Sequence, residues 1–127
     1  MQSRNKPRMT QAEREHVTRK PKKISLRPYH GYVFLCDTRE SLAAEYKRWT
    51  RNDYPYQDDP LGGRYVRIET GSGNPVWLIW GGTTTALVHE IAHVLLHTFG
   101  AIGHNPTEGD GEPFCYMLSA LMDEAIK

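Results

Sequence analysis

The sequence predicts a single α+β domain in which a small, largely antiparallel sheet packs against helices. Residues 29–38 and 75–80 are rich in β-branched and aromatic side chains, as strands are. The segment that ends near Phe99 and residues 112–127 space their apolar side chains as helices do. Stretches rich in Gly, Pro, Asn and Asp separate these segments. The length of 127 residues is that of one domain.

The first half of the domain is predicted to hold one strand and one helix. Residues 29–38, YHGYVFLCDT, form the strand. Residues 41–51 form the helix, because apolar residues recur there at helical spacing after a candidate N-cap, Ser41. Residues 52–63 are predicted to be a loop from their Asn, Asp, Pro and Gly content.

A β-hairpin and two helices are predicted for the second half. Residues 64–70 and 75–80 form the hairpin around GSGN, and the second strand is so apolar that both of its faces should be buried. One of three consecutive threonines, Thr83 to Thr85, caps a helix that ends near Phe99. After a loop, residues 112–127 form the last helix, with a proline in the first turn.

Positive charge is concentrated at the start of the chain. Residues 1–27 contain nine Lys/Arg and two Asp/Glu, a balance of about +7, whereas residues 28–127 contain seven and thirteen, about −6. The first segment has few large apolar residues to offset the entropy of ordering, so we expect a flexible basic arm. Such an arm either solubilises the protein or binds nucleic acid or an acidic partner. The domain proper is predicted to be residues 28–127.

Composition also limits the cellular setting. No apolar segment is long enough to span a bilayer, and no secretory signal core is present, so we expect a cytoplasmic protein. Cys36 and Cys115 lie among apolar residues and are expected to be buried thiols, with a disulfide as the alternative.

Residues 87–100, LVHEIAHVLLHTFG, contain a metal-binding pattern. His89 and His93 lie four residues apart, so on a helix both imidazoles can bind one metal ion, for which Zn²⁺ is the best match. Glu90 lies beside the open face of that ion, where a carboxylate can accept a proton from water. The other positions are apolar, and buried polar groups must be satisfied. The alternative is that these are core histidines hydrogen-bonded to the backbone or to Glu90.

A third ligand is required from outside this helix. Glu112 is the leading candidate, because it opens the last helix, where the helix dipole favours a carboxylate. Its rivals are Asp110, Glu108 and His104. Tyr116, one turn after Glu112, is a candidate to hydrogen-bond a ligand or the reacting oxyanion, with a position in the core as the alternative. His97 is predicted to support the site or to pack in the core, because ligands at three successive turns would span about 12 Å.

The stretch TTTALVHEIAHVLLHTFG, followed by GDGEPFCYMLSALMDEA, resembles the active-site core of the zincin metallopeptidases with a glutamate ligand, and among them the ImmA/IrrE-like proteins. The resemblance covers residues 64–127. It implies a minimal zincin-like fold, zinc ligands His89, His93 and Glu112, and Glu90 as general base. The longer three-histidine pattern is absent, because Leu96 and Phe99 stand where it needs glycine and histidine. SprT-like proteins are a looser match, with His104 as third ligand.

Two functions therefore follow as hypotheses. The first is a zinc metallopeptidase that hydrolyses a protein or peptide substrate, with residues 76–80 as an edge strand along the cleft that pairs with the substrate. The second is a non-catalytic, zinc-stabilised binding or regulatory protein, in which Cys115 is a conceivable fourth ligand. The small size and the basic arm are typical of phage-encoded proteins.

Overall fold

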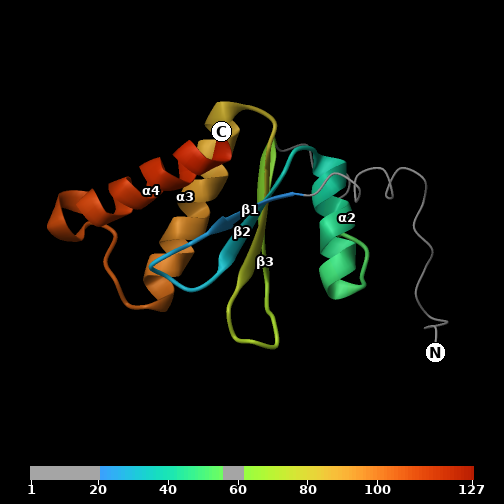
Figure 1. The fold of residues 1–127 in the computed structure, drawn as a ribbon, viewed down its shortest axis with the longest axis horizontal. Helices are drawn as coiled ribbons and strands as arrows, with labels where there is room; N and C mark the ends of the chain where they lie inside the picture. Colours follow the sequence, from blue (N-terminus) through green and yellow to red (C-terminus); the bar gives the residue numbers. More distant parts are fainter. Residues whose placement is uncertain (1–20, 56–61) are drawn as a thin grey trace.

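The computed structural model describes residues 21–55 and 62–127, which fold as an α+β domain around a mixed four-stranded sheet (Figure 1). The strands are β1 (Lys22–Ser25), β2 (Tyr32–Cys36), β3 (Gly63–Ile68) and β4 (Val76–Gly81), in the order β1-β2-β4-β3. The outer pairings β1–β2 and β3–β4 are antiparallel, and the central pairing β2–β4 is parallel. The fold class predicted from the sequence is thus confirmed.

Helices cover the two faces of the sheet unequally. Helix α2 (Arg39–Thr50) lies on one face, and α3 (Thr84–Ala101) and α4 (Glu112–Ala125) lie together on the other (Figure 1). A short 3-10 turn, η1 (Glu108–Gly111), leads into α4. Strand β4 runs through the middle of the sheet with residues 76–79 buried, which confirms the prediction that both of its faces are covered.

Each face of the sheet has its own hydrophobic core, because side chains alternate along a strand. Under α3 and α4, Trp77 and Ile79 of β4 pack with Ile91 and Leu95 of α3 and with Leu121 of α4. Under α2, a second core is formed by Cys36, Leu42, Tyr54, Ile68, Val76 and Leu78.

Threonine side chains fix the starts of α2 and α3. Thr83 is the residue that caps α3, and its Oγ1 accepts a hydrogen bond from the Ala86 backbone N–H at 3.0 Å. The prediction of Ser41 as a cap is wrong: Thr38 caps α2, and its Oγ1 accepts from the Ser41 N–H at 3.0 Å. The helix therefore begins at Arg39, and Ser41 is a buried residue of its first turn.

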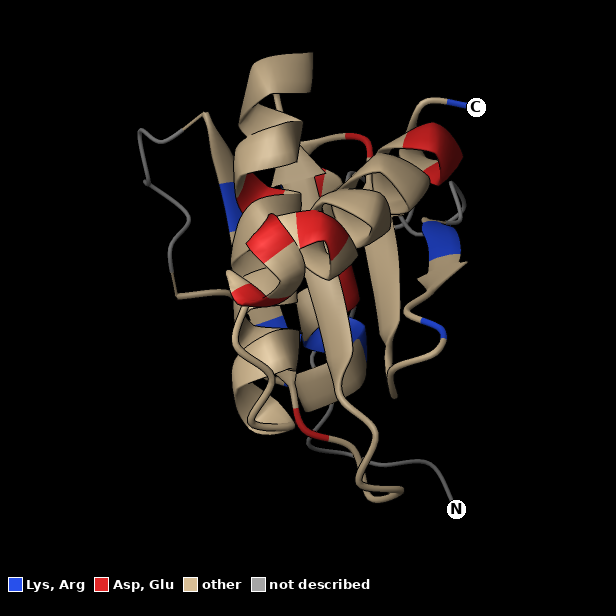
Figure 2. Cartoon of the chain, turned by 90° about the vertical axis from the view of Figure 1, so that its left-hand side faces the viewer, with Lys and Arg blue, Asp and Glu red and all other residues tan. Residues whose placement is uncertain are grey.

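Part of the segment predicted as the arm belongs to the sheet. Residues 1–20 lie outside the described residues, as do positions 56–61 of the predicted loop, but Lys22–Ser25 form β1. Ile24 and Leu26 are buried, so this segment anchors itself despite its charge. Lys22 Nζ also donates to the backbone oxygen of Glu124 at 2.7 Å, beside the acidic end of α4 in Figure 2. The domain boundary therefore falls before residue 22.

Two further expectations can be compared with the structure. Cys36 is buried as predicted, whereas Cys115 is exposed on α4, and neither forms a disulfide. Within the described ranges, no helix has the length and apolarity needed to cross a membrane.

Candidate metal centre

The candidate centre is built on the first half of α3. His89 and His93 lie one turn apart on the exposed side of this helix, while Ile91, Val94 and Leu95 are buried against the sheet. The buried residues thereby fix the rotation of the helix, so that both imidazoles project from the same side.

The two imidazoles are close enough to share an ion. His89 Nε2 and His93 Nε2 are 3.1 Å apart, and the ring planes meet at 75°. Two nitrogens bound to one tetrahedral zinc ion at 2.0–2.1 Å lie about 3.3 Å apart. The donor set therefore fits zinc. Without a metal, the same distance allows one imidazole to donate a hydrogen bond to the other.

Glu90 completes a group of potential ligand atoms. One atom each of His89, Glu90 and His93 lies within 4.8 Å of the other two. The Glu90 side chain is buried, at 7% exposure, and this desolvation raises the pKa of its carboxyl group above the ordinary value, against the opposing effects of His89, His93 and Arg64. A buried carboxyl group beside two imidazoles is positioned to exchange protons with a bound water.

Strand β3 forms the opposite wall of the site. The Tyr65 ring stacks on His93 with centroids 4.7 Å apart and planes 21° apart, and Tyr65 Oη lies 3.4 Å from His97 Nε2. Gly63 leaves room for the Glu90 side chain, because a Cβ there would be 3.2 Å from Glu90 Cγ and 2.9 Å from the Trp80 backbone oxygen. Strand and helix thus hold His93 and Glu90 from both sides.

A surface hollow of about 520 Å³ opens between these walls. Residues from the start of β3 and from the first half of α3 line it: Gly62, Gly63, Arg64, Tyr65, Thr83, Thr85, Ala86, His89, Glu90 and His93. Strand β3 is an edge strand, and no other strand of the described part of the chain pairs with its outer side. The predicted edge role of residues 76–80 is wrong, since β4 pairs with β2 on one side and with β3 on the other.

The structure does not bring Glu112 to the two histidines. Glu112 is exposed at the first turn of α4, and it is not a member of the ligand group formed by His89, Glu90 and His93. Phe114 contacts Phe99, with ring centroids 5.7 Å apart, so the start of α4 lies beside the end of α3. Helix α4 crosses back over α3 (Figure 1), and its last residue, Ala125, lines a common hollow with Leu87 of the first turn of α3.

The other predicted residues of this region also lie apart from the group. Tyr116 is 72% exposed on α4. His104 pairs with Glu108, with His104 Nε2 and Glu108 Oε2 3.3 Å apart, and Asp110 is exposed with a left-handed backbone. His97 is exposed rather than packed in the core, with its ring 5.5 Å from that of Trp77 and its Nε2 3.4 Å from Tyr65 Oη.

Sequence reasoning missed Tyr65. The only signal available was its place in a strand of alternating side chains, and nothing in the spacing connects it to His93, 28 positions later in the chain. Comparison with known protein families, with curated proteins and with solved structures finds no match to this chain.

Proposed function

We propose that the protein is a zinc-dependent metallopeptidase, in which His89 and His93 hold the metal ion and Glu90 is the general base. The observation that carries the proposal is the 3.1 Å separation of the two imidazole nitrogens, with the buried Glu90 carboxyl group beside them. An edge strand along the same hollow adds a place for an extended substrate.

Each residue has a defined task in this reaction. When bound, zinc supplies a Lewis acid that polarises a carbonyl oxygen and lowers the pKa of water toward neutrality. Glu90 accepts a proton from the attacking water and passes it to the leaving amine. Tyr65 stacks on His93 and limits the rotation of its ring, which keeps the imidazole nitrogen aimed at the metal. The exposed backbone of β3 pairs with the substrate strand.

The third ligand is part of the proposal. Catalytic zinc sites usually have three protein ligands and one open position. We keep Glu112 for this place on the strength of the resemblance, with Glu108, Asp110 and His104 as alternatives. For Glu112 to bind, the first turn of α4 must approach the exposed side of α3.

Metal content tests the ligands. The full chain and its His89→Ala, His93→Ala and Glu112→Ala variants are equilibrated with zinc, dialysed and measured by elemental analysis. His97→Ala is the matched control, because it removes an exposed imidazole of the same helix that is not in the group. We expect about one zinc per chain in wild type and His97→Ala, and loss of zinc in the other three. A wild-type chain that binds no zinc refutes the proposal.

Activity is tested separately from binding. Glu90→Gln preserves the size of the side chain and removes the base, so we expect it to retain zinc and to lose about a hundredfold or more in peptide cleavage. Cleavage is detected by mass spectrometry of a peptide mixture incubated with zinc-loaded protein. Full activity in Glu90→Gln would contradict the role of Glu90 as base.

A second candidate is a non-catalytic, zinc-stabilised binding or regulatory protein. The observation that favours it is the distance of Glu112 from the histidines, because a site with two protein ligands lacks the usual catalytic set. Zinc that is bound and raises the melting temperature, without any peptide cleavage, would select this candidate over the peptidase.

A further inference from the structure

Helix α2 covers only part of its face of the sheet and leaves a strip that no other described element covers. The outer strands of a four-stranded sheet are about 14 Å apart, whereas a helix with its side chains is about 10–12 Å across. On the other face two helices share the sheet and α4 reaches β1, but α2 packs on β2, β3 and β4. Within residues 21–55 and 62–127, no helix therefore covers the surface above β1 and the neighbouring part of β2.

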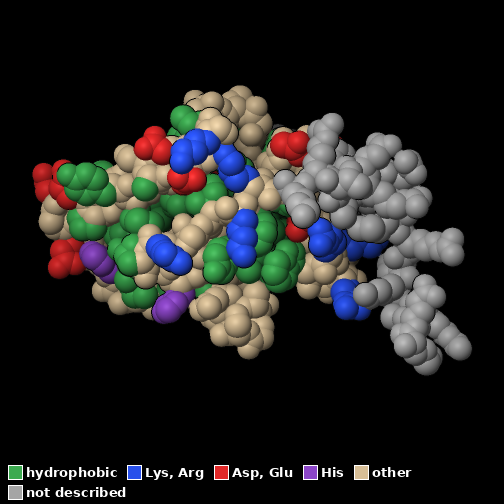
Figure 3. Space-filling view, viewed as in Figure 1, with side chains coloured by type: hydrophobic (Ala, Val, Ile, Leu, Met, Phe, Trp, Pro, Cys, Tyr) green, Lys and Arg blue, Asp and Glu red, His purple; other side chains and the backbone are tan. Residues whose placement is uncertain are grey.

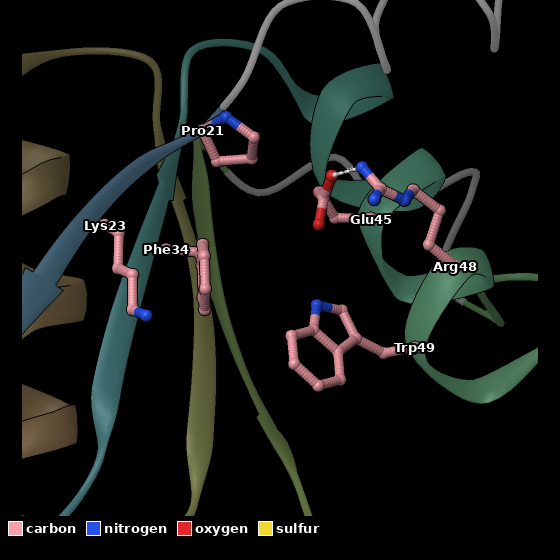
Figure 4. Close-up of a pocket in the computed structure, with 6 residues that line it drawn as sticks. All are labelled: Pro21, Lys23, Phe34, Glu45, Arg48 and Trp49. Carbon is pink, nitrogen blue, oxygen red and sulfur yellow. Dashed lines mark hydrogen bonds and ion pairs between the residues drawn. The ribbon is translucent and has the colours of Figure 1, made fainter.

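Aromatic side chains line this strip. Phe34 of β2 and Trp49 of α2 face each other across it, with ring centroids 5.9 Å apart and planes 54° apart (Figure 4). Trp49 is 42% exposed and Tyr32, further along β2, is 37% exposed. Between strand and helix lies a hollow of about 500 Å³, lined by Pro21, Lys23, Phe34, Glu45, Arg48 and Trp49.

Cationic groups border the aromatic rings. Lys23 Nζ lies 4.2 Å from the centroid of the Tyr32 ring and 6.0 Å from that of Phe34. Arg48 Nη1 donates to the buried Glu45 Oε1 at 3.0 Å, so this carboxylate is neutralised and half of the Arg48 side chain stays exposed. The formal charge of the hollow is therefore +1. In Figure 3 the basic side chains of this face alternate with hydrophobic ones.

We propose that this strip binds single-stranded nucleic acid, with bases stacked on Trp49 and Phe34 and a phosphate held by Lys23. Exposed aromatic rings bordered by cations are the platform on which such strands bind, and stacking accepts any base. The sequence adds charge of the same sign, because the segment up to residue 27 carries about +7. This binding is independent of the metal centre, which lies by the opposite edge strand, β3.

The backbone argues against an extended peptide as the occupant. The rings of Tyr32 and Phe34 stand on β2, which is already paired with β1 on one side and with β4 on the other, so a peptide lying over these rings finds no free backbone hydrogen-bonding groups in β2. Peptide binding at a sheet depends on such backbone hydrogen bonds, whereas base stacking and phosphate contacts need none.

The test is a titration of a labelled single-stranded oligothymidylate with the full chain, followed by fluorescence anisotropy at several salt concentrations. We expect Trp49→Ala to weaken binding about tenfold, and Trp49→Phe, which retains a stacking ring, to weaken it much less. Lys23→Ala should reduce the salt slope by about 0.7. Arg67→Ala is the matched control, because it removes an exposed cation from β3, where Arg67 pairs with Glu69 at 2.8 Å.

Several results would overturn the proposal. One is wild-type affinity in Trp49→Ala, together with equal effects of Lys23→Ala and Arg67→Ala, which would mean general attraction to the basic segment. Another is equal or tighter binding of duplex DNA of the same length. A third is tighter, Trp49-dependent binding of an acidic tyrosine-containing peptide. If Trp49→Ala does not fold, Trp49→Phe and Lys23→Ala decide the matter.

Discussion

Gly81, the last residue of β4, should not tolerate a larger side chain, because α3 begins directly against it. A Cβ at this position would lie 2.6 Å from the backbone nitrogen of Leu87 and 2.7 Å from its Cα, whereas ordinary contacts are 3.4–4 Å. In Gly81→Ala the helix must therefore retreat by nearly 1 Å. Its first turn carries the Thr83 cap and leads to His89, so this contact sets where the imidazoles lie relative to β3.

The expected cost follows from this overlap. Inserting a methyl group where backbone cannot yield costs about 1–3 kcal/mol of unfolding free energy. For a domain of this size, that lowers the melting temperature by roughly 4–12 °C. We would measure urea and thermal unfolding of Gly81→Ala beside Gly100→Ala, because a Cβ at Gly100 in the same helix meets nothing within 4 Å. The control should gain up to about 1 kcal/mol. Wild-type stability in Gly81→Ala would refute the reasoning.

Further outcomes are expected at the cap and at the two thiols. Thr83→Ala removes the hydrogen bond to Ala86 and should lower the unfolding free energy in urea by about 1 kcal/mol. A maleimide reagent should label exposed Cys115 in the native protein and label Cys36 only after unfolding, as read by mass spectrometry. Burial raises the pKa of Cys36 from 9.0 to about 12, so the unfolded chain loses this proton first and stability declines between those pH values. The decline is up to about 4 kcal/mol, and pH-dependent urea unfolding should show it reduced in Cys36→Ala.

The parts of the fold that local patterns determine could be predicted from the sequence. The apolar run of residues 75–80 predicts a strand buried on both faces, and β4 (Val76–Gly81) has this environment. The GSGN turn predicts the antiparallel β3–β4 hairpin. The spacing of His89, Glu90 and His93 within an apolar helix likewise brings their ligand atoms together, because the helix itself fixes their relative positions.

The order of the strands could not be predicted in the same way. An apolar run shows that a strand is buried but not which strands flank it. The sequence therefore predicts β4 as an edge strand, whereas the edge strand beside it is β3. Strand β1 was assigned to the arm because its lysines dominate the composition of residues 21–27. The buried side chains of Ile24, in β1, and of Leu26, directly after it, fix this segment on the core. Contacts between residues distant in sequence, such as the stacking of Tyr65 on His93, depend on the order of the strands and could not be predicted without it.

The third ligand shows most clearly what spacing leaves open. A loop that leads from α3 into α4 predicts that the second helix comes back across the first, as it does in Figure 1. The loop does not predict where along α3 the first turn of α4 lies. Phe114 meets Phe99, which lies six residues beyond His93 and ten beyond His89, and at 1.5 Å per residue these intervals are about 9 Å and 15 Å along the helix. Glu112 therefore starts beyond the end of the site, and a metal that recruits it has to draw the first turn of α4 toward the histidines. Zinc binding in Glu112→Ala thus decides between a rigid two-histidine site and one that closes around its ion.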